Sequence, residues 1–212
     1  MSPTLSKATK LDDTTTLVKQ TQNGDRQAFS ELVRRYQTTV YRSCYRILGD
    51  KEDAKDASQE NFLRAYNKVD TFRGRSTFKT WLLRVAMNVS LNERSSRSRK
   101  VPHNKIGLAQ QFVASTEAPD ADLMRAEAAS QIHDALQLLR PDHRAAIVLR
   151  ELEGLTYQET AESLGIAEGT AKSWVHRGRE QLKRIMLEQR EVSEKGQHRQ
   201  PSFREGLFSV NR

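Results

Sequence analysis

The sequence predicts an all-α protein made of two small helical domains joined by an extended linker. Apolar residues recur at spacings of three and four over long stretches of the 212 residues, and no convincing run alternates as a half-buried strand does. A polar segment, residues 97–121, lies between these stretches and contains Pro102, Gly107 and Pro119. We interpret it as the linker. With 36% hydrophobic residues, two small cores fit the composition better than one large core.

The first domain is expected to span residues 24–96. Before it, in residues 1–23, we expect a disordered tail over residues 1–12 and a short helix over residues 13–22. Asp25 is placed to cap its first long helix, whose apolar residues form one buried face. Gly49 is a typical residue for the end of that helix. Cys44, the single cysteine, lies on the buried face, so we interpret it as a core residue and not as a nucleophile.

Two further helices complete this domain. Asp50 is predicted to cap a helix that runs to about Val69. A short loop, residues 70–75, follows. A fourth helix then begins at Ser76 or Thr77, and its apolar positions again recur at helical spacing.

The second domain is expected in residues 122–187 and to contain a helix-turn-helix. Thr156 and Glu159 have the spacing of a capping box, and Gly165 supplies a turn. The predicted helices are residues 122–139, 142–153, 156–164 and 168–187. The composition of the remaining tail, residues 188–212, predicts disorder.

Charge is distributed unevenly along the chain. Lys and Arg number 35 against 27 Asp and Glu, a balance that favours a polyanionic partner such as nucleic acid. Residues 73–100 hold eight basic residues and one acidic residue, whereas residues 50–62 hold five acidic and two basic residues. Solvated helix faces explain the acidic block well, but such dense positive charge repels itself unless an anion is near. The two blocks therefore suggest different partners for one domain.

The predicted recognition helix presents a polar, basic face. Lys172, His176, Arg179 and Lys183 share one outward stripe, and Ser173 and Arg177 lie beside it. A short helix, a tight turn and a second helix with such a face have the geometry that enters a major groove. An ordinary helical hairpin with solvated cations is the alternative interpretation.

No pattern in the sequence indicates catalysis, a cofactor or a metal site. The five histidines lack metal-ligand spacing, and there is no glycine-rich phosphate loop or nucleophile elbow. No run of about 18 apolar residues and no apolar leader is present, so we expect a cytoplasmic protein without membrane insertion.

Five sequence segments together resemble bacterial RNA polymerase sigma factors of the extracytoplasmic-function type in the sigma-70 family. They are DASQENFLRAY (56–66), FRGRSTFKTWLLRVAMN (72–88), LLRP (138–141), ELEGLTYQE (151–159) and GTAKS (169–173). The resemblance implies a non-enzymatic subunit that binds core RNA polymerase and directs promoter recognition, melting and initiation in a stress or envelope response. It also implies an anti-sigma partner, and DNA bound both as duplex and as melted single strand.

The resemblance also implies a role for each charged surface. Core polymerase would bind Asp53, Asp56, Gln59 and Glu60. The minus-ten element would bind Phe72, Arg73, Arg75, Ser76, Lys79, Arg84, Asn88 and Asn92. The minus-thirty-five element would bind Thr170, Lys172, Ser173, His176, Arg177, Arg179 and Lys183.

Physical chemistry fits these roles. Arg84, Asn88 and Asn92 recur every four residues, so they share one helical face, where Arg suits phosphate and Asn suits a base edge. Phe72 beside basic residues suits an unpaired strand, although a core position is the alternative for this ring. Trp174 and Gly178 depart from the family pattern, in which Arg and Ala are usual.

Two other classes of protein compete with this interpretation. A self-sufficient helix-turn-helix repressor or activator would need a dimer helix that the sequence does not show, and it leaves the acidic helix unexplained. A site-specific recombinase would need a strand-rich catalytic domain with a Ser or Tyr nucleophile.

Overall fold

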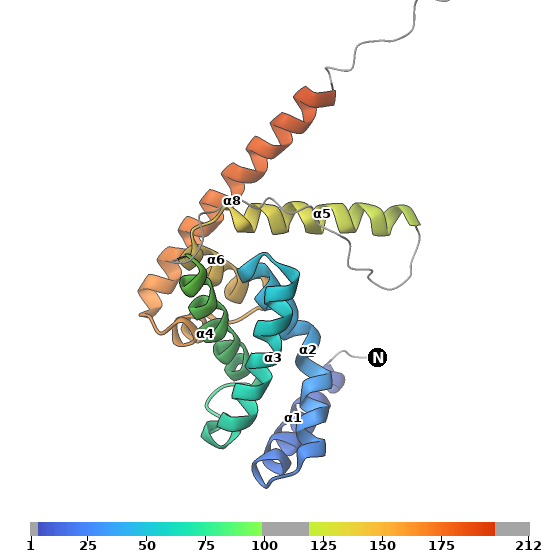
Figure 1. Cartoon of the computed structure of the whole chain (residues 1–212), viewed down its shortest axis with the longest axis vertical. Coiled ribbons are helices and arrows are strands. Elements are labelled where there is room, and N and C mark those ends of the chain that lie inside the picture. Colours follow the sequence, from blue (N-terminus) through green and yellow to red (C-terminus); the bar gives the residue numbers. More distant parts are fainter. Residues whose placement is uncertain (1–3, 99–118, 198–212) are drawn as a thin grey trace, which may run out of the picture.

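The structure is a computed structural model that describes residues 4–98 and 119–197, and within these ranges it is helical without any strand. The helices are shown in Figure 1. They are α1 (Thr4–Gln22), α2 (Arg26–Leu48), α3 (Lys51–Lys68), α4 (Phe78–Ser98), α5 (Pro119–Gln137), α6 (Pro141–Ile147), α7 (Tyr157–Leu164) and α8 (Glu168–Gln197). A 3-10 turn, Val69–Thr71, follows α3, and a π-helical turn, Val148–Leu152, extends α6. The all-α prediction is confirmed.

The helix boundaries of the first half follow the local capping signals in the sequence. The Asp25 carboxylate accepts hydrogen bonds from the backbone N–H groups of Gln27 and Ala28 at 2.8 and 3.1 Å. Gly49 ends α2 in the left-handed conformation, and the Asp50 carboxylate accepts from the Asp53 N–H at 3.0 Å. Each cap satisfies a backbone group that the helix itself leaves unpaired.

The first core lies among α1, α2, α3 and α4, and its fully buried centre includes Leu32, Val40 and Leu82. Cys44 is buried in the same cluster, as expected from its place on the apolar face of α2. This four-helix unit is the platform that fixes the position of the acidic and basic surfaces.

The helix-turn-helix is present in the second half of the chain. Thr156 and Glu159 form a reciprocal capping box at the start of α7, and Gly165 ends α7 at φ 67°. The turn then leads into α8, which packs against α6. The residues that hold this turn are close in sequence, which is why the motif is visible there.

Two terminal segments are more helical than expected. We expected residues 1–12 to be disordered, but α1 begins at Thr4. We expected disorder from residue 188, but α8 continues to Gln197 and extends from the body as a long rod (Figure 1). The α8 extension, residues 188–197, contains mostly Glu, Gln, Lys and Arg, which are strong helix formers, and this explains the difference at that end. Residues 198–212 and most of the predicted linker, 99–118, lie outside the described residues.

The two halves of the molecule share one apolar cluster. Ile47 of α2 and Leu83 and Met87 of α4 are at most 1% exposed, and they pack with Leu136 and Val175 of the second half. The composition suggested a separate small core for each domain. The structure instead completes the second core with side chains from the first domain, because these faces of α2 and α4 are apolar.

Candidate nucleic-acid and polymerase interface

An acidic face with an apolar centre lies on α3. Asp56 and Gln59 are exposed, and Glu60 forms an ion pair with Arg64 one turn later at 2.6 Å. Leu63 is 63% exposed, and its spacing from Asp56 and Gln59 puts it on the same helical face. An exposed leucine among charged side chains is the kind of anchor that protein interfaces use.

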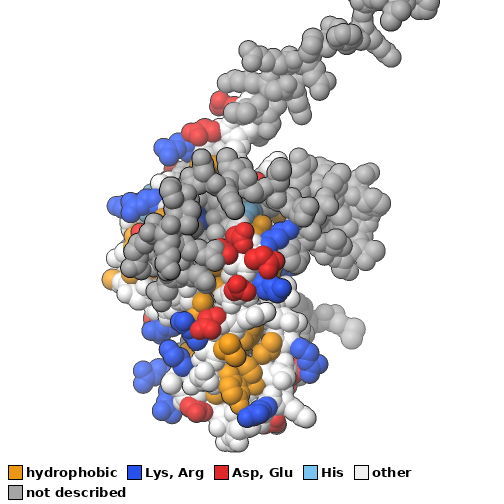
Figure 2. Space-filling view, in the orientation of Figure 1, with side chains coloured by type: hydrophobic (Ala, Val, Ile, Leu, Met, Phe, Trp, Pro, Cys, Tyr) orange, Lys and Arg blue, Asp and Glu red, His pale blue; other side chains and the backbone are white. Residues whose placement is uncertain are grey.

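Two details of this face differ from the set of residues predicted from the sequence. Asp53 is half-buried in the first turn of α3, where an acidic residue also stabilises the helix dipole. Leu63 was not among the predicted residues, although its spacing of seven from Asp56 was a usable signal. Figure 2 shows acidic side chains gathered near the middle of the molecule, with Lys and Arg side chains on both sides of them.

The loop before α4 is held in place by Gln22. Its side-chain amide donates to the carbonyl oxygens of Val69 and Phe72 at 2.9 and 3.0 Å. The Phe72 ring is half-buried and contacts Phe78 and Trp81 with both centroid distances at 5.7 Å. The ring therefore belongs largely to the core, while Arg73 and Arg75 of the same loop are exposed.

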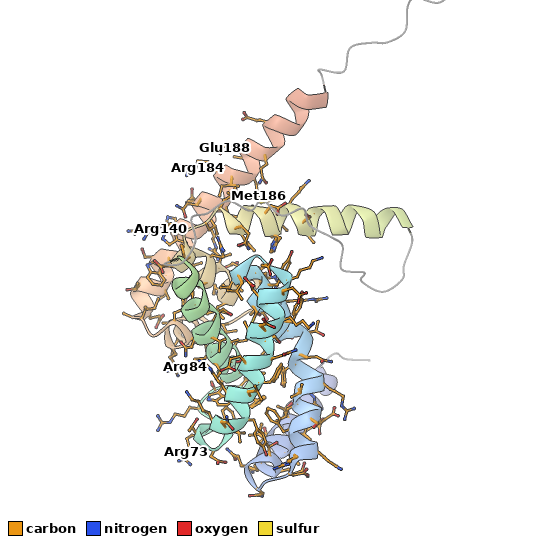
Figure 3. All side chains as sticks on the ribbon, in the orientation of Figure 1. Arg73, Arg84, Arg140, Arg184, Met186 and Glu188 are labelled. Carbon is orange, nitrogen blue, oxygen red and sulfur yellow. The ribbon has the colours of Figure 1, made fainter. Side chains whose placement is uncertain are left out.

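Exposed side chains from the loop and from α4 face the same side of the molecule. Arg84 and Asn88 are exposed one turn apart, and Figure 3 shows Arg73 and Arg84 both pointing away from the body. The Asn92 side chain lies outside the described residues, although its backbone belongs to α4. The arrangement gives a cationic surface with one amide beside it, which suits phosphates and a base edge.

The start of α4 is tied to the second half of the chain. Thr77 caps the helix, since its hydroxyl accepts from the Thr80 N–H at 3.1 Å. Ser76 is half-buried beside it. The Lys79 ammonium lies 3.2 Å from the Glu153 carboxylate and donates to the Glu153 carbonyl oxygen at 2.8 Å. Lys79 was predicted as a DNA contact, and the contact with Glu153 was not visible in the sequence.

The recognition helix, α8, keeps its basic stripe exposed. Lys172, His176, Arg177, Arg179 and Lys183 are all exposed, whereas Thr170 and Ser173 are half-buried. The exposed stripe agrees with the periodicity of the sequence. It is therefore accessible to a DNA duplex.

Two cations on α8 are held by nearby carboxylates. Lys172 pairs with Glu168 at 2.7 Å, and the hydrogen bond between them raises the pKa of Lys172. Arg179 pairs with Glu151 at 2.6 Å, and this hydrogen bond raises the pKa of Arg179. The Tyr157 ring lies under Lys172, with the ammonium 5.9 Å from the ring centroid. These pairs orient both cations before any DNA arrives.

The two departures from the family pattern face the protein interior. Trp174 is half-buried and packs on the second core. Gly178 is buried, and a Cβ at this position would lie 2.6 Å from Ile147 Cγ1 and 3.3 Å from the His143 carbonyl oxygen. Gly178 therefore allows α8 to approach α6 closely.

Neither a metal site nor a membrane span was found in the part of the chain that the structure describes. Within it, no group of three or more His, Cys, Asp or Glu side chains is placed to hold a metal ion. The described helices also include none long and apolar enough to cross a bilayer.

Comparison with known proteins identifies both halves of the chain. Residues 32–100 match Sigma-70 region 2, and residues 129–182 match Sigma-70 region 4. The RNA polymerase sigma-H factor of Pseudomonas aeruginosa is 34% identical over 177 residues, which cover 80% of this chain and 92% of that protein. The ECF RNA polymerase sigma-E factor of Haemophilus influenzae is 35% identical over 174 residues, with 78% and 91% covered.

Solved structures share the fold. The sigma factor RpoE of Bartonella quintana, solved with the anti-sigma factor NepR, is 24% identical with a TM-score of 0.61, and the match covers 75% of this chain and 96% of that one. CnrH, solved with the cytosolic domain of CnrY, is also 24% identical with a TM-score of 0.57, covering 80% and 94%. The chain therefore belongs to the sigma-70 family as an ECF-type RNA polymerase sigma factor, a non-enzymatic subunit that directs RNA polymerase to promoters.

Proposed function

We propose that this sigma factor binds core RNA polymerase through the exposed face of α3. Asp56, Gln59 and Glu60 supply the polar contacts, Leu63 supplies an apolar anchor, and Asp53 contributes from the edge of the face. The observation that carries the proposal is the position of this face on the same four-helix unit as the cationic surface of α4. One small domain thereby offers one surface to a protein and another to DNA.

The minus-ten element would bind the loop before α4 and the outer face of α4. Arg73, Arg75 and Arg84 attract the phosphates, and Asn88 is placed to read a base. Because the Phe72 ring is packed against Phe78 and Trp81, its role is to support the loop that holds the unpaired strand. Ser76, just before α4, and Asn92, four residues after Asn88 in α4, complete the proposed set of residues.

The minus-thirty-five element would bind α8 in the major groove. Lys172 and Ser173 lie in the first turns of the helix, where such proteins approach base edges. Thr170, His176, Arg177, Arg179 and Lys183 complete the proposed DNA-binding surface.

We also infer that the protein acts in the cytoplasm, where RNA polymerase transcribes, and that an anti-sigma factor restrains it until a stress or envelope signal arrives. The solved sigma factor of Bartonella quintana, which has a similar fold and carries the anti-sigma factor NepR, supports the expectation of an anti-sigma partner.

Reconstituted transcription tests the proposal directly. Core polymerase with this chain should give a specific transcript from a promoter template, and core alone should not. Permanganate reactivity of thymines near the start site should depend on the chain, and Arg84→Ala with Asn88→Ala should reduce it without unfolding the protein. A specific transcript that forms equally well without the chain would contradict the proposal.

A further inference from the structure

The side chain of Gln22, the last residue of α1, holds the loop that precedes α4. We propose that Gln22 is a positioning residue for capture of the melted promoter strand. Its amide fixes the backbone from which Arg73 and Arg75, the loop arginines, project. Gln22 acts in this role without touching DNA. The inference rests on the proposed minus-ten function, which assigns this loop to the unpaired strand.

The Gln22 amide bridges two carbonyl oxygens at the start of the loop. Its nitrogen, Nε2, lies 2.9 Å from the Val69 oxygen and 3.0 Å from the Phe72 oxygen. A side-chain amide carries two N–H donors, so these two bonds use the full donor capacity of the group. The partners are 47 and 50 residues away along the chain. Gln22 therefore ties the N-terminal helix to the loop.

The Gln22 side chain projects from a rigid base. Val18, one turn earlier in α1, is 3% exposed in the first core. Directly after Gln22 the chain turns toward α2, and the Gly24 N–H donates to the Thr21 carbonyl oxygen at 2.9 Å. Because the backbone is fixed on both sides of Gln22, its half-buried side chain can hold a neighbouring segment in one place.

The bond to the Phe72 carbonyl oxygen sets the direction of the loop. The Phe72 ring packs on Phe78 and Trp81 and fixes this residue in the core, but it leaves the following peptide group free to rotate. A peptide group is planar, so a hydrogen bond that holds its C=O also fixes the N–H of Arg73. Figure 3 shows the Arg73 side chain pointing away from the body. The Gln22 amide therefore determines where the first loop arginine begins.

Few other constraints act on the loop. Within the described part of the chain, the backbone groups of residues 73–76 form no hydrogen bond with other backbone groups. The next anchor is Thr77, whose hydroxyl caps α4. The loop arginines are exposed between these two anchors. Loss of the Gln22 bonds would therefore release the loop at one end.

A loop that is ordered before DNA arrives favours capture of an unpaired strand. The strand is flexible, and ordering both partners at once costs more conformational entropy than ordering the DNA alone. The loop arginines can then act on the phosphates from fixed positions. Loss of the Gln22 amide should therefore weaken capture of the melted strand and leave the surfaces of α3 and α8 unchanged.

Gln22→Met tests this role, because methionine has a similar length but no N–H donor. The Val69 carbonyl oxygen would keep the Phe72 N–H as a partner at 3.0 Å, so we expect the variant to fold, which circular dichroism checks. With core polymerase and a promoter template, permanganate reactivity near the start site should fall at least about fivefold, while affinity for core stays unchanged. The control is Gln20→Met, an exposed position of the same helix, which should behave as the wild type.

Double variants show whether Gln22 acts through the loop arginines. In a chain with Arg73→Ala and Arg75→Ala, Gln22→Met should cause at most about a twofold further loss, because the side chains that it positions are gone. In the Asn88→Ala background the full loss should remain, because Asn88 belongs to α4 and not to the loop. A merely structural role of Gln22 would reduce opening by the same factor in both backgrounds. Low salt keeps the residual opening of the double variants measurable.

Limited trypsin digestion measures the loop without DNA. Trypsin cleaves after Arg73 and Arg75, and cleavage requires a locally flexible backbone. Gln22→Met should raise the initial rate of cleavage in this loop at least about threefold relative to Gln20→Met, because one end of the loop is released. Cleavage at arginines within the helices should be unchanged, which distinguishes loop release from global unfolding. Fragment masses identify the cut sites.

The outcomes separate this inference from the proposed function. If the wild type opens the promoter and a folded Gln22→Met variant opens it equally well, the positioning role of Gln22 is wrong while the proposed function stands. Equal losses in the two double-variant backgrounds would also overturn the positioning role. If the wild type with core gives neither permanganate reactivity nor a specific transcript, the proposed function fails and the inference fails with it.

Discussion

Arg144 is fully buried between the two domains although it belongs to none of the motifs. Its guanidinium donates to the Ile47 carbonyl oxygen at 2.9 Å and to the Leu139 carbonyl oxygen at 3.2 Å. It also donates to the Gln137 side-chain oxygen at 2.6 Å and to the Gln137 carbonyl oxygen. Arginine suits this position because its planar guanidinium can donate hydrogen bonds to several carbonyl groups at once, including one at the end of α2.

Replacing Arg144 should destabilise the whole fold. Arg144→Met should lower the free energy of unfolding by about 3 kcal/mol or more, because several buried carbonyl oxygens would lose their donor. Urea unfolding followed by circular dichroism measures the loss. The control is Arg140→Met. The Arg140 side chain is 67% exposed and its guanidinium lies 3.7 Å from the Asp142 carboxylate, so this substitution should change stability by at most about 0.5 kcal/mol. Equal stabilities of the two variants would contradict the structural role of Arg144.

Two cations of the recognition helix should differ in what they contribute to promoter binding. Lys172→Ala should change which upstream bases are preferred, since a lost base contact costs about 1–3 kcal/mol at one position. Arg179→Ala should weaken binding to all promoter sequences alike, as expected for a lost phosphate contact. It should also reduce the slope of log affinity against log salt concentration by about one unit. Binding of the full chain with core polymerase to a library of upstream elements at two salt concentrations distinguishes them. The reverse pattern would mean that α8 docks in the opposite register.

At the scale of single elements, α3 should be the surface that core polymerase recognises. Asp56→Lys should weaken association with core by tenfold or more, or about 1.4 kcal/mol, because it places a cation at the centre of the acidic face. Glu162→Lys makes the same charge change at an exposed position of α7, outside α3, and is the matched control. Pull-down or titration with labelled core measures both. Equal affinity for the two variants would exclude this face as the main contact.

The crossing of α6 and α8 depends on Gly178. Gly178→Ala should gain up to about 1 kcal/mol of helix propensity but lose about 1–3 kcal/mol through the clash with Ile147, so net destabilisation is expected. Thermal and urea unfolding measure the change. In the Ile147→Ala background the same substitution should be less harmful, because the clashing atoms are gone. A stabilising effect of Gly178→Ala in the wild-type background would show that α6 and α8 adjust without strain.

At the scale of the whole molecule, the contact between the domains should be sensitive to acid. His133 of α5 stacks on Tyr45 of α2, with centroids 4.1 Å apart. Burial lowers the pKa of His133, and Arg144 and Arg46 act in the same direction, whereas Asp134 and a backbone hydrogen bond with Gly49 oppose them. Because the folded pKa lies below the unfolded value of about 6.5, the unfolded chain binds the proton more tightly.

The sign of the pH dependence follows from this difference. The contribution of neutral His133 to the free energy of unfolding is fully present above the unfolded pKa of about 6.5. It is lost as the pH falls below that value toward the folded pKa. His133→Phe keeps a stacked ring but cannot titrate, so its free energy of unfolding should depend less on pH between 7.5 and 5.5. Urea unfolding at several pH values measures both slopes. Parallel slopes in wild type and variant would exclude His133 as a source of the acid sensitivity.

The accuracy of the sequence predictions differed between local and long-range features. Helix starts at Asp25, Asp50 and Thr156 were predicted because a cap joins residues only a few positions apart. The exposed stripe of α8 was predicted because helical periodicity alone determines it. The start of α1 and the end of α8 were misjudged. Strong helix formers explain the extension of α8 beyond its apolar pattern, whereas the Thr-rich start of α1 has no such explanation.

The sequence by itself determined the all-α class, the helix-turn-helix and the charged surfaces, because each depends on spacing within one helix or one turn. Only the tertiary structure decided how the domains meet. Lys79 and Glu153 are separated by 74 residues, and Thr80 and Glu159 by 79. No periodic pattern connects positions so far apart along the chain. Their pairing arises because the apolar faces of α2 and α4 complete the second core and bring the acidic and basic side chains together.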